Sequence, residues 1–518
     1  MKFFKVIFSR IAIIALSIIA QIGLFILLGY YADRDIYSVH IILNILAIFL
    51  VLFIFLKDEP SIYKLPWIMI ILVAPLFGII LYMLLGYRIM PKKIVNRIKS
   101  INSYGETLNK KYGCIDQLEE ESKSAYGQAQ YLMKTTNMPL YKNQEATYYK
   151  TGELFYEAYL KEIAKAEKYI FMEYFIIEDG EMFNKILEIL EARIKEGVKV
   201  YLMYDDVGSV GKVPWNYYKK LREKGIEAVK FNPFNPIVSG SHNNRDHRKI
   251  TVIDGKVGFV SGMNLADEYI NLVTKFGHWK DNGIMFKGNA VNNLVLSFIQ
   301  LYNISYHLYL RPEDFLPDDV LEEKEVNNEF EQGYDGYLLP FVDGPSPVDN
   351  YYIGKNAFLN IINLSNKYIY IATPYLIVDF HFLEALKNAA IRGVDVRIIT
   401  PHIADKKTVN ILTKNSYYTL VSSGVKVYEY EPGFIHSKMI VSDDTTAIVG
   451  TINLDHRSFV HHYENAVWMY KTSCIFDVKK DFEEMFENDV IEIEKNSSKL
   501  KWYQRIIRNI LVVFSVLF

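Results

Sequence analysis

The chain contains HRKITVID at residues 247–254 and HSKMIVSD at residues 436–443. A second short match follows each copy, with SGMN at 261–264 and GTIN at 450–453. The two histidines and the two asparagines are both 189 positions apart (436 − 247 and 453 − 264). One His-x-Lys triplet arises by chance in many chains, but two copies with the same downstream spacing indicate a duplicated unit.

Strand-like and helix-like segments repeat around these motifs. The strand-like segments are residues 168–177 and 197–203 in the first half and 367–371 and 393–399 in the second. An amphipathic stretch separates the members of each pair, and this alternation predicts parallel β-α-β units. We therefore predict an α/β fold with two tandem, pseudo-symmetric α-β-α sandwich domains, over 136–315 and 336–490. The polar and acidic stretch at 311–335 is predicted to link them.

Each motif is predicted to form a β-hairpin. Residues two apart in a strand point to the same face, so the His and Lys of each triplet share a face. Asp254-Gly255 and Asp443-Asp444 have the composition of two-residue hairpin turns. Asp254 and Asp443 complete the repeated motif, but they fall on the other strand face. We interpret them as residues that stabilise the hairpin and do not touch a substrate.

The predicted register gathers three kinds of polar group on one face of each hairpin. The pairs that it places opposite one another are His247 with Gly262 and His436 with Thr451. Asn264 and Asn453 follow two positions further along the same face. Each hairpin would then present an imidazole, an ammonium group and a carboxamide together.

These groups suit chemistry at a phosphate ester. Lysine neutralises phosphate oxygens, a carboxamide donates a hydrogen bond to them, and histidine attacks phosphorus or carries a proton near neutral pH. If the two sets face each other, one histidine can attack while the other protonates the leaving alkoxide, and no metal is required. The candidate catalytic residues are His247, Lys249, Asp254, His436, Lys438 and Asp443, and the candidate phosphate-binding residues are Asn264 and Asn453.

Three apolar runs occupy the first 90 residues. They span 11–31, 36–56 and 65–87, and about 20 apolar residues suffice to cross a bilayer. We predict two to three transmembrane helices, with a kink in the third run at Pro75 and Gly78. A cleaved signal peptide is the alternative for the first run, although an A-x-A cleavage pattern is missing.

Basic residues flank the apolar segments. Residues 91–135 are interpreted as a basic, amphipathic linker. The stretch 495–518 is interpreted as an amphipathic C-terminal helix that lies on the membrane, or alternatively packs on the catalytic domain. Positive charge is balanced on the two sides of the apolar runs, so the positive-inside rule does not decide the orientation. The dense basic cluster at 92–99 favours catalytic domains on the cytoplasmic side.

Composition excludes several classes of function. The 58 basic and 60 acidic residues give a net charge of −2, which argues against a dedicated nucleic-acid-binding protein. The two cysteines, Cys114 and Cys474, are too far apart in sequence to indicate a disulfide framework, and no His/Cys cluster indicates a zinc site.

The sequence resembles the phospholipase D superfamily, whose signature is two HKD motifs, and more closely the bacterial cardiolipin synthases. The resemblance extends from about residue 35 to the end of the chain. Beside the hydrophobic N-terminal helices, the stretches that carry it are FNPFNP at 231–236, RDHRKI at 245–250, WKD at 279–281 and NLDHRSF at 453–459. The first apolar run departs from the common two-helix pattern of the family, and Ser261 stands where glycine is more usual.

The resemblance implies an enzyme that moves a phosphatidyl group from one phosphatidylglycerol to another and releases glycerol. His247 would form a phosphatidyl-histidine intermediate, and His436 would act first as general acid and then as general base. Asp281 and Glu464 stand at the places where family members have acids that orient the histidines. Arg245 and Arg457 would contact lipid phosphate or form salt bridges.

Several alternatives remain open on the sequence alone. A phospholipase D-type hydrolase, or another phosphatidyltransferase of the superfamily, would use the same intermediate. A membrane scaffold without chemistry is disfavoured because both motifs are intact. The family reading implies no cofactor, phosphatidylglycerol and cardiolipin as lipid partners, and a multi-pass protein of the cell membrane. It leaves the acyl-chain preference and the oligomeric state undetermined.

Overall fold

A computed structural model describes residues 10–30, 34–86, 92–233, 244–305, 309–317, 336–345, 351–495 and 511–512. The chain divides into a small unit that includes Met1–Pro91 and a large unit formed by Lys92–Pro233 and Asn244–Lys501. Most of the expected C-terminal helix, part of the expected linker at 311–335 and residues 234–236 of the FNPFNP stretch lie outside the described residues.

The first half of the large unit contains a seven-stranded sheet, and the ten-stranded sheet of the second half contains seven strands in the equivalent order. In the first half the order is β2 (Glu145–Tyr149), β10 (Gly283–Lys287), β8 (Val257–Ser261), β7 (Ile250–Ile253), β3 (Tyr169–Tyr174), β4 (Lys199–Asp205) and β5 (Ile226–Phe231). In the second it is β11 (Tyr337–Asp343), β20 (His462–Tyr470), β18 (Thr446–Gly450), β17 (Met439–Ser442), β12 (Tyr368–Ala372), β14 (Asp395–Pro401) and β15 (Lys426–Tyr430). The duplication predicted from the motifs is therefore confirmed.

Each sheet is mixed and not wholly parallel. The strands β3, β4 and β5 run parallel, as do β12, β14 and β15, in agreement with the predicted β-α-β units. The strands on the other side, including the motif hairpins β7–β8 and β17–β18, pair antiparallel. All six residues of β3 and all five of β12 are buried, which explains why both segments are rich in apolar residues, with Glu173 as the charged exception in β3.

Short strands and helices complete the large unit. The further strands are β1 (Tyr141–Lys142), β6 (Arg245–Asp246), β9 (His278–Lys280), β13 (Leu376–Ile377), β16 (Gly433–Ile435), β19 (Leu454–Asp455) and β21 (Val490–Glu492). The helices within the repeats are α9 (Gly152–Ile163), α10 (Glu181–Lys195), α11 (Tyr217–Glu223), α12 (Val291–Ser305), α14 (Ile353–Leu364), α15 (Phe380–Ile391), α16 (Lys407–Asn415), α17 (Tyr417–Ser422), α18 (His456–Val460) and α19 (Cys474–Asn488).

The two halves share one core. Helix α12 packs on β3, β5, β7 and β8 of its own sheet and also on β11 of the second sheet. Helix α19 occupies the corresponding place in the second half and packs on β17 and β18 and also on β2 of the first sheet. The strand β1, although it lies in the first half of the sequence, pairs with β11. The two repeats are therefore parts of a single folded body.

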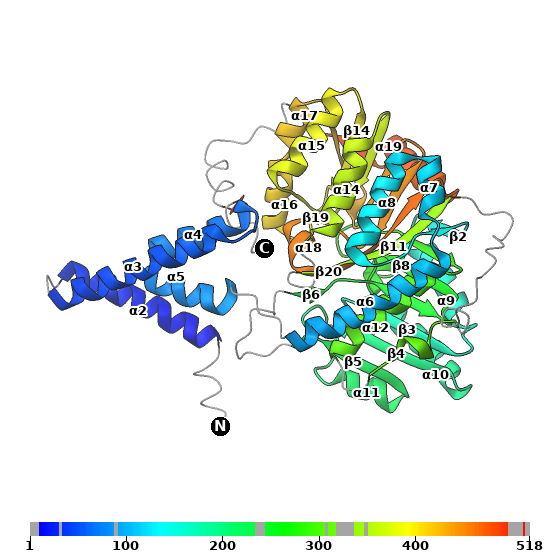
Figure 1. Cartoon of the computed structure of the whole chain (residues 1–518), viewed down its shortest axis with the longest axis horizontal. Coiled ribbons are helices and arrows are strands. Elements are labelled where there is room, and N and C mark those ends of the chain that lie inside the picture. The colour runs from blue at the N-terminus through cyan, green and yellow to red at the C-terminus, as the bar shows by residue number, and fades with distance from the viewer. Residues whose placement is uncertain are drawn as a thin grey trace. The chain divides into compact units, whose positions relative to one another are not determined.

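The segment expected to be a linker at 91–135 is instead helical cover for this body. It forms α6 (Lys92–Tyr112), α7 (Ile115–Glu121) and α8 (Lys123–Thr136). Helix α6 packs on α12, and α8 packs on α14 and β11 (Figure 1). The Ser122 hydroxyl accepts a hydrogen bond from the Ala125 N–H at 3.2 Å and caps α8. The apolar faces of these helices are buried, so the segment does not act as a free connection.

The two-residue turns predicted in the motif hairpins are present. Asp254 and Gly255 have φ angles of 53° and 67°, and Asp443 and Asp444 have 55° and 59°, so all four lie in the left-handed region. The hydrogen bonds that close the turns run from Lys256 N–H to the Ile253 carbonyl at 2.9 Å and from Thr445 N–H to the Ser442 carbonyl at 3.1 Å. Glycine, asparagine and aspartate tolerate this region best, which explains the turn composition.

The register of both hairpins differs from the prediction by one residue. Ile253 pairs with Val257 and Ser442 pairs with Thr446, so Lys256 and Thr445 each add one unpaired residue after the turn. Such a bulge changes which residues oppose each other along the strands. The predicted pairs, His247 with Gly262 and His436 with Thr451, are therefore wrong by one position.

The small unit contains the apolar helices. They are α2 (Arg10–Tyr30), α3 (Arg34–Leu56), α4 (Ser61–Val73) and α5 (Pro75–Leu81), and a π-helical turn follows at Tyr82–Gly86. Among the described residues, one stretch is both long and apolar enough to cross a membrane, Tyr37–Leu56, with a mean hydropathy of 3.0. It corresponds to the second of the three predicted runs.

The third apolar run is broken at Ala74. A Cβ on Gly78 would lie 2.6 Å from the Cα of Ile71. In a continuous helix, seven residues separate two positions by about 10 Å, so α5 folds back against α4. Pro75, which has no backbone N–H to continue the hydrogen-bond ladder, begins α5. The kink predicted at Pro75 and Gly78 is thus a reversal, and the third run is not one continuous span.

Candidate active site

Each motif lies beside a strand of the opposite half. The strand β6, just before His247, pairs in parallel with the start of β20, and the His247 N–H donates to the Tyr463 carbonyl at 2.9 Å. The second motif has the mirrored arrangement, because β16 pairs in parallel with β9. There the His436 N–H donates to the Lys280 carbonyl at 2.7 Å. The backbone of each half therefore holds the catalytic motif of the other.

This exchange pairs each histidine with a carboxylate of the opposite half. His247 Nδ1 lies 2.9 Å from Glu464 Oε2, and His436 Nδ1 lies 2.6 Å from Asp281 Oδ2. Both carboxylates are completely buried. A carboxylate at Nδ1 fixes the proton there and leaves the lone pair on Nε2, the nitrogen that faces a substrate. The two acids expected to orient the histidines do contact them, but the crossing between halves was not predicted.

The two carboxylates differ in how many donors share their charge. Besides His247, Glu464 accepts hydrogen bonds from the Thr451 hydroxyl and, at 2.7 Å, from the Ser458 hydroxyl. Asp281 accepts its other hydrogen bond from the Asn282 N–H at 2.9 Å. Gly262 leaves room for Asp281, because a Cβ there would lie 2.5 Å from Asp281 Oδ1. Thr451 and Gly262 occupy equivalent motif positions. In the second half this position provides a hydroxyl that donates to Glu464, whereas in the first half the missing side chain makes room for Asp281.

The two lysines are buried beside the histidines. Lys249 Nζ donates to the His247 carbonyl at 2.6 Å, and Lys438 Nζ donates to the His436 carbonyl. Burial lowers the pKa of Lys249 to about 8 and that of Lys438 to about 7, although the nearby Glu464 and Asp281 carboxylates oppose this change. An anion bound between the lysines would stabilise their charged forms.

Burial disfavours the charged form of both imidazoles. Burial, followed by the charges of Lys249 and Lys438, holds the pKa of His247 well below its usual value. Burial and the Lys438 charge lower the pKa of His436 to about 4, against the opposing effect of Asp281. A neutral imidazole has the free lone pair that a nucleophile needs.

The two candidate phosphate-binding asparagines, Asn264 and Asn453, have different hydrogen-bond partners. Asn264 Oδ1 accepts the Ile176 N–H at 3.0 Å, and its Nδ2 donates to the Tyr269 hydroxyl at 2.5 Å. The ring of Tyr269 lies 5.4 Å from that of His436, which links Asn264 to the motif of the other half. Asn453 Oδ1 is buried and has no hydrogen-bond partner in the part of the chain that the structure describes. The Asn453 N–H donates to the Ser458 hydroxyl at 3.2 Å, and that hydroxyl donates to Glu464 at 2.7 Å, which links the Asn453 backbone to the His247–Glu464 pair.

The two motif aspartates hold the hairpins in place. The Asp254 carboxylate accepts three backbone N–H groups at the start of β3, and the Asp443 carboxylate accepts three at the start of β12. The donors are Glu167, Lys168 and Tyr169 in the first half and Asn366, Lys367 and Tyr368 in the second, at 2.7–2.9 Å. Seven residues of extended chain, about 20 Å, separate each aspartate from its motif histidine. Asp254 and Asp443 were grouped with the candidate catalytic residues because they complete the repeated motif. Their contacts are instead those of residues that hold the hairpins in place, which was the second prediction made for them.

The comparisons with known proteins agree with this geometry. A family model described as cardiolipin synthase, PLD-like domain matches residues 159–280 and again 358–490. The phospholipase D-nuclease N-terminal model matches residues 42–86. A cardiolipin synthase of Alkalihalophilus pseudofirmus is 32% identical over 480 residues, which is 92% of this chain and 92% of that protein.

The chain belongs to the cardiolipin synthase family of the phospholipase D superfamily. A cardiolipin synthase 2 of Staphylococcus epidermidis is 33% identical over 91% of this chain and 94% of its own length. An uncharacterized protein of Streptococcus mutans is 40% identical over 87% of this chain and 96% of its own. The crystal structure of a phosphatidylserine synthase from Haemophilus influenzae aligns with 75% of this chain and 97% of its own, with a TM-score of 0.57 and 14% identity. That likeness confirms the fold, and the resemblance read from the sequence is confirmed.

This member of the cardiolipin synthase family supports its first motif with two buried arginines. Arg245 Nε lies 2.8 Å from Asp205 Oδ2, and Arg248 Nε lies 2.7 Å from Glu173 Oε1. Both arginines are buried, so Arg245 forms the salt bridge that was one of its two predicted roles. Arg457 lies close enough to His247 for its charge to lower the pKa of that histidine. The Glu173 and Asp205 partners come from β3 and β4, and no sequence spacing pointed to them.

Aromatic and imidazole rings flank the two histidines, and sequence reasoning missed them. His462 lies 5.3 Å from His247 between ring centroids, and Trp279 lies 5.3 Å from His436. The strand β20 also brings His247, His462 and Glu464 together, with one ligand atom of each within 4.8 Å of the others. The expectation from the sequence concerned only His/Cys clusters, so it missed this grouping of two histidines with a glutamate. The signal was His462-x-Glu464, two residues that share a strand face.

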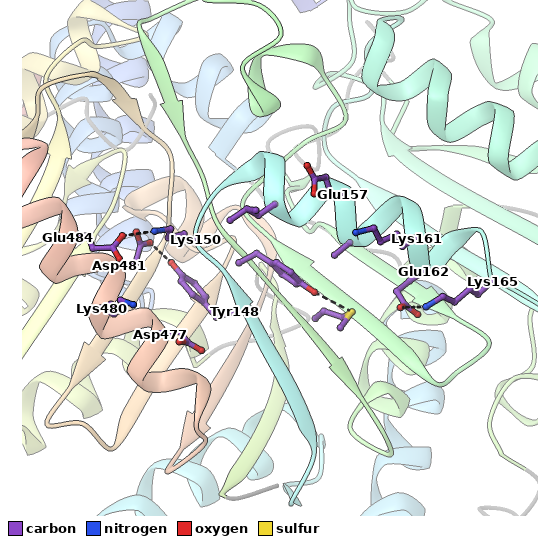
Figure 2. Close-up of a pocket in the computed structure, with 14 residues that line it drawn as sticks. Tyr148, Lys150, Glu157, Lys161, Glu162, Lys165, Asp477, Lys480, Asp481 and Glu484 are labelled. Atoms are coloured by element: carbon purple, nitrogen blue, oxygen red, sulfur yellow. Dashed lines mark hydrogen bonds and ion pairs between the residues drawn. The ribbon is translucent and has the colours of Figure 1, made fainter. Parts of the chain in front are cut away.

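A separate pocket lies between β2, α9 and α19 (Figure 2). It has a volume of about 650 Å³, and neither motif histidine lines it. Its charges are largely paired, because Lys150 Nζ lies 2.6 Å from Glu484 Oε2 and Lys165 Nζ lies 2.7 Å from Glu162 Oε1. The Tyr148 hydroxyl donates to Asp481 at 2.6 Å. Neither motif lysine lines this pocket, so it is separate from the candidate active site.

Proposed function

We propose that the protein is a cardiolipin synthase that transfers a phosphatidyl group from one phosphatidylglycerol to another and releases glycerol. The observation that carries the proposal is the pair of histidine–carboxylate contacts formed across the two halves, beside two buried lysines. Relatives named cardiolipin synthase, such as that of Alkalihalophilus pseudofirmus, align over nearly the whole chain. The protein is accordingly a phosphatidyltransferase that acts by transesterification.

The first half-reaction is an attack of His247 Nε2 on phosphorus. A P–N bond forms and the P–O bond to glycerol breaks. His436 enters this step as the imidazolium, with one proton shared with Asp281 at Nδ1 and the other on Nε2, and the Nε2 proton passes to the departing glycerol oxygen. In the second half-reaction, His436 takes the proton from a hydroxyl of the second phosphatidylglycerol. That oxygen attacks phosphorus, the P–N bond breaks, and the lone pair returns to His247. Protons and bonds balance over the cycle, and a phosphatidyl-histidine is the intermediate.

The unequal environments of the carboxylates support this assignment of the histidines. Glu464 shares its charge among His247, Thr451 and Ser458, so it stabilises an imidazolium at His247 less strongly. Asp281 makes the shorter contact, 2.6 Å, and raises the pKa of His436 against the effect of burial. His436 is therefore the better proton carrier. The negative phosphodiester adds to this effect when it lies between the two rings.

Lys249, Lys438, Asn264 and Asn453 are proposed to hold the phosphate. The lysines lie on the same strand faces as their histidines and are buried, so their charges act in a low dielectric where they attract an anion strongly. Asn453 and Asn264 would donate hydrogen bonds to the non-bridging oxygens. These groups stabilise the additional charge that develops on oxygen in the transition state.

We place the protein in the cell membrane as a multi-pass protein with its catalytic unit on the cytoplasmic side. The apolar stretch Tyr37–Leu56 supports a membrane association. The cationic start of α6, with Lys92, Lys93, Arg97 and Lys99, supports the orientation, because basic residues next to membrane spans are retained in the cytoplasm. Phosphatidylglycerol and cardiolipin in that membrane are the proposed lipid partners.

The test is an assay of the purified full-length protein in phosphatidylglycerol vesicles, with lipids and glycerol resolved by mass spectrometry. We expect cardiolipin and glycerol to form in equal amounts, and His247→Ala to form neither. Phosphatidic acid without cardiolipin would replace the proposal with hydrolysis by a phospholipase D-type enzyme. A product that depends on a different added alcohol would indicate another phosphatidyltransferase.

A further inference from the structure

We propose that His247, His462 and Glu464 form a binding site for a transition-metal cation, and that Zn²⁺ bound there inhibits the enzyme. The site overlaps the nucleophile of the proposed reaction, so the inhibitory consequence rests on the proposed function. The binding of the metal does not rest on it.

The three ligand atoms are already close to metal-binding distances. Glu464 Oε2 lies 2.9 Å from His247 Nδ1, and Glu464 Oε1 lies 3.5 Å from His462 Nδ1. One ligand atom of each residue lies within 4.8 Å of the other two. In a tetrahedral zinc site, with bonds of about 2.0–2.2 Å, neighbouring ligand atoms are about 3.3 Å apart. Small rotations of the two rings are enough to close the site.

His462 supplies an independent observation. Its Nδ1 is buried and makes no close hydrogen bond among the residues that the structure describes, and its contact with Glu464 Oε1 is long, at 3.5 Å. A buried polar atom without a partner is uncommon, because losing its hydrogen bonds to water is costly. The atom lies next to Glu464, so a cation between them would satisfy it.

The other half of the molecule shows what this position looks like without a ligand. Arg245 and Phe434 occupy equivalent positions in the two halves, because they lie 189 residues apart (434 − 245). Arg245 pairs with His462 in the neighbouring strand. Phe434 pairs with Trp279 in the same way. His462 and Trp279 thus occupy the same place, each beside a motif histidine. An indole N–H donates hydrogen bonds only and cannot bind a metal. The metal site therefore exists on the His247 side alone.

The donor set matches the chemistry of zinc. Two imidazoles and one carboxylate form a common three-ligand set for Zn²⁺, with a fourth position left for water. The side chains of His247 and His462 are 9% and 11% exposed, so the cation can enter from the side on which a substrate reaches His247.

The same geometry explains why the metal would inhibit. A cation on His247 Nδ1 uses the lone pair of that nitrogen, and the ring proton moves to Nε2. The imidazole keeps one proton and stays neutral, but Nε2 no longer has a lone pair with which to attack phosphorus. The Glu464 contact that fixes the productive tautomer is lost at the same time. Inhibition should therefore compete with formation of the phosphatidyl-histidine.

The experiment uses the full-length protein in detergent after treatment with a chelator. Co²⁺ serves as a spectroscopic probe and Zn²⁺ is measured by equilibrium dialysis. We expect one strongly bound equivalent in the unsubstituted protein and at least tenfold weaker binding in His462→Asn, because even outer partners of metal ligands cost about 10–100-fold. The control is His402→Asn, which removes another histidine bonded to a glutamate, Glu429, and should bind the metal as the unsubstituted protein does.

Activity and folding provide the remaining outcomes. Zn²⁺ should inhibit His402→Asn as it inhibits the unsubstituted protein, whereas His462→Asn should need at least tenfold more. If His462→Asn does not fold, the same measurements are made on His462→Trp, because tryptophan is the residue found at the equivalent position, Trp279, in the other half. Equal binding to the unsubstituted protein and a folded His462 variant, or no bound equivalent at all, would overturn the proposal. A protein that binds Co²⁺ but makes no cardiolipin would refute the proposed function and leave the metal site standing.

Discussion

At the scale of single residues, chemistry depends on small differences between two equivalent positions. Gly262 and Thr451 occupy the same motif place, yet the first leaves space for Asp281 and the second donates to Glu464. These differences make the Asp281 carboxylate the stronger support for a protonated histidine. The two distinct roles that we propose for the duplicated motif rest on these differences, although its sequence is nearly symmetric.

The first prediction concerns the order in which the histidines act. His247→Ala should form no covalent adduct with labelled phosphatidylglycerol, because the attacking nitrogen is missing. His436→Ala should form an adduct slowly and then fail to release it, since no group accepts the proton of the incoming hydroxyl. An acid-quenched reaction followed by peptide mapping measures the adduct. Label on His436 would reverse the assignment, and turnover without label on either residue would reject the covalent mechanism.

The second prediction concerns the alkaline side of the pH profile. The lysine pKa values of about 7 for Lys438 and about 8 for Lys249 mean that these groups lose their charge as the pH rises through that range. The value of kcat/KM should therefore fall between pH 7 and 9. Lys438→Arg should move the fall to higher pH, because a guanidinium keeps its proton there.

Protein stability over the same range provides the control. A lysine whose pKa is lower in the folded than in the unfolded state makes the unfolded state bind more protons, so its contribution to stability rises with pH. The melting temperature should accordingly not fall between pH 7 and 9. A parallel loss of folding and activity would attribute the pH profile to unfolding and contradict the prediction.

The third prediction is that turnover needs no divalent metal. Lys249 and Lys438 supply the positive charge that a metal would otherwise place on the phosphate, and His247 supplies the nucleophile. Activity in the presence of EDTA should be unchanged, or higher where zinc had been bound. Complete loss of activity with EDTA, restored by one specific metal, would refute this prediction.

At the scale of secondary-structure elements, the hairpins show what local sequence can and cannot determine. The turns at Asp254-Gly255 and Asp443-Asp444 were predictable because few residue types tolerate positive φ. The bulges at Lys256 and Thr445 were not, since neither residue has a special conformation or composition. Strand positions after a bulge are set by pairing with neighbouring strands, which lie far away in the sequence.

The exchange of carboxylates between halves has the same origin. Asp281 and Glu464 could be found from their spacing within the family pattern, but their partners follow from the pairing of β9 with β16 and of β20 with β6. Two repeats with similar sequences give no indication of whether a strand of one repeat pairs with a strand of the other. In the same way, the apolar faces of α6 and α8 were visible, but not the surfaces on which they pack.

The fourth prediction tests the role of the motif aspartate in the hairpin. Asp254→Asn removes the charge that three backbone N–H groups share, so the free energy of unfolding should fall by about 2–4 kcal/mol. Activity per folded molecule should change much less. Thermal melting and specific activity should be measured on the same preparation.

The control for this prediction lies in the other hairpin. Asp444→Asn removes a partly exposed ion pair with Lys479 and keeps the left-handed turn, so it should cost no more than about 1 kcal/mol. If Asp254→Asn keeps full stability but loses turnover, the aspartate acts in the site and the hairpin interpretation is wrong.

At the scale of the whole molecule, the catalytic site belongs to the large unit alone. The described motif residues, their carboxylates and the helices α6–α8 that cover the sheets all lie between Lys92 and Lys501. The histidine–carboxylate pairs need both halves, so neither half can form the site by itself. The small unit contributes apolar helices, with no His-x-Lys motif in its sequence.

The last prediction is that the small unit governs access to lipid and not the chemistry. A chain that begins at Lys92 retains the helical cover and both sheets, so it should fold and should form cardiolipin from short-chain or detergent-dispersed phosphatidylglycerol. On vesicles its rate should fall well below that of the full chain, because the apolar stretch Tyr37–Leu56 no longer concentrates the enzyme at the bilayer. A chain cut instead at residue 137 is the matched comparison, since it also loses α6, α7 and α8 and exposes the core against which they pack. We expect that shorter chain to be unstable by thermal melting. If the chain from Lys92 melts cooperatively yet forms no product from any form of the lipid, the small unit must take part in the reaction itself.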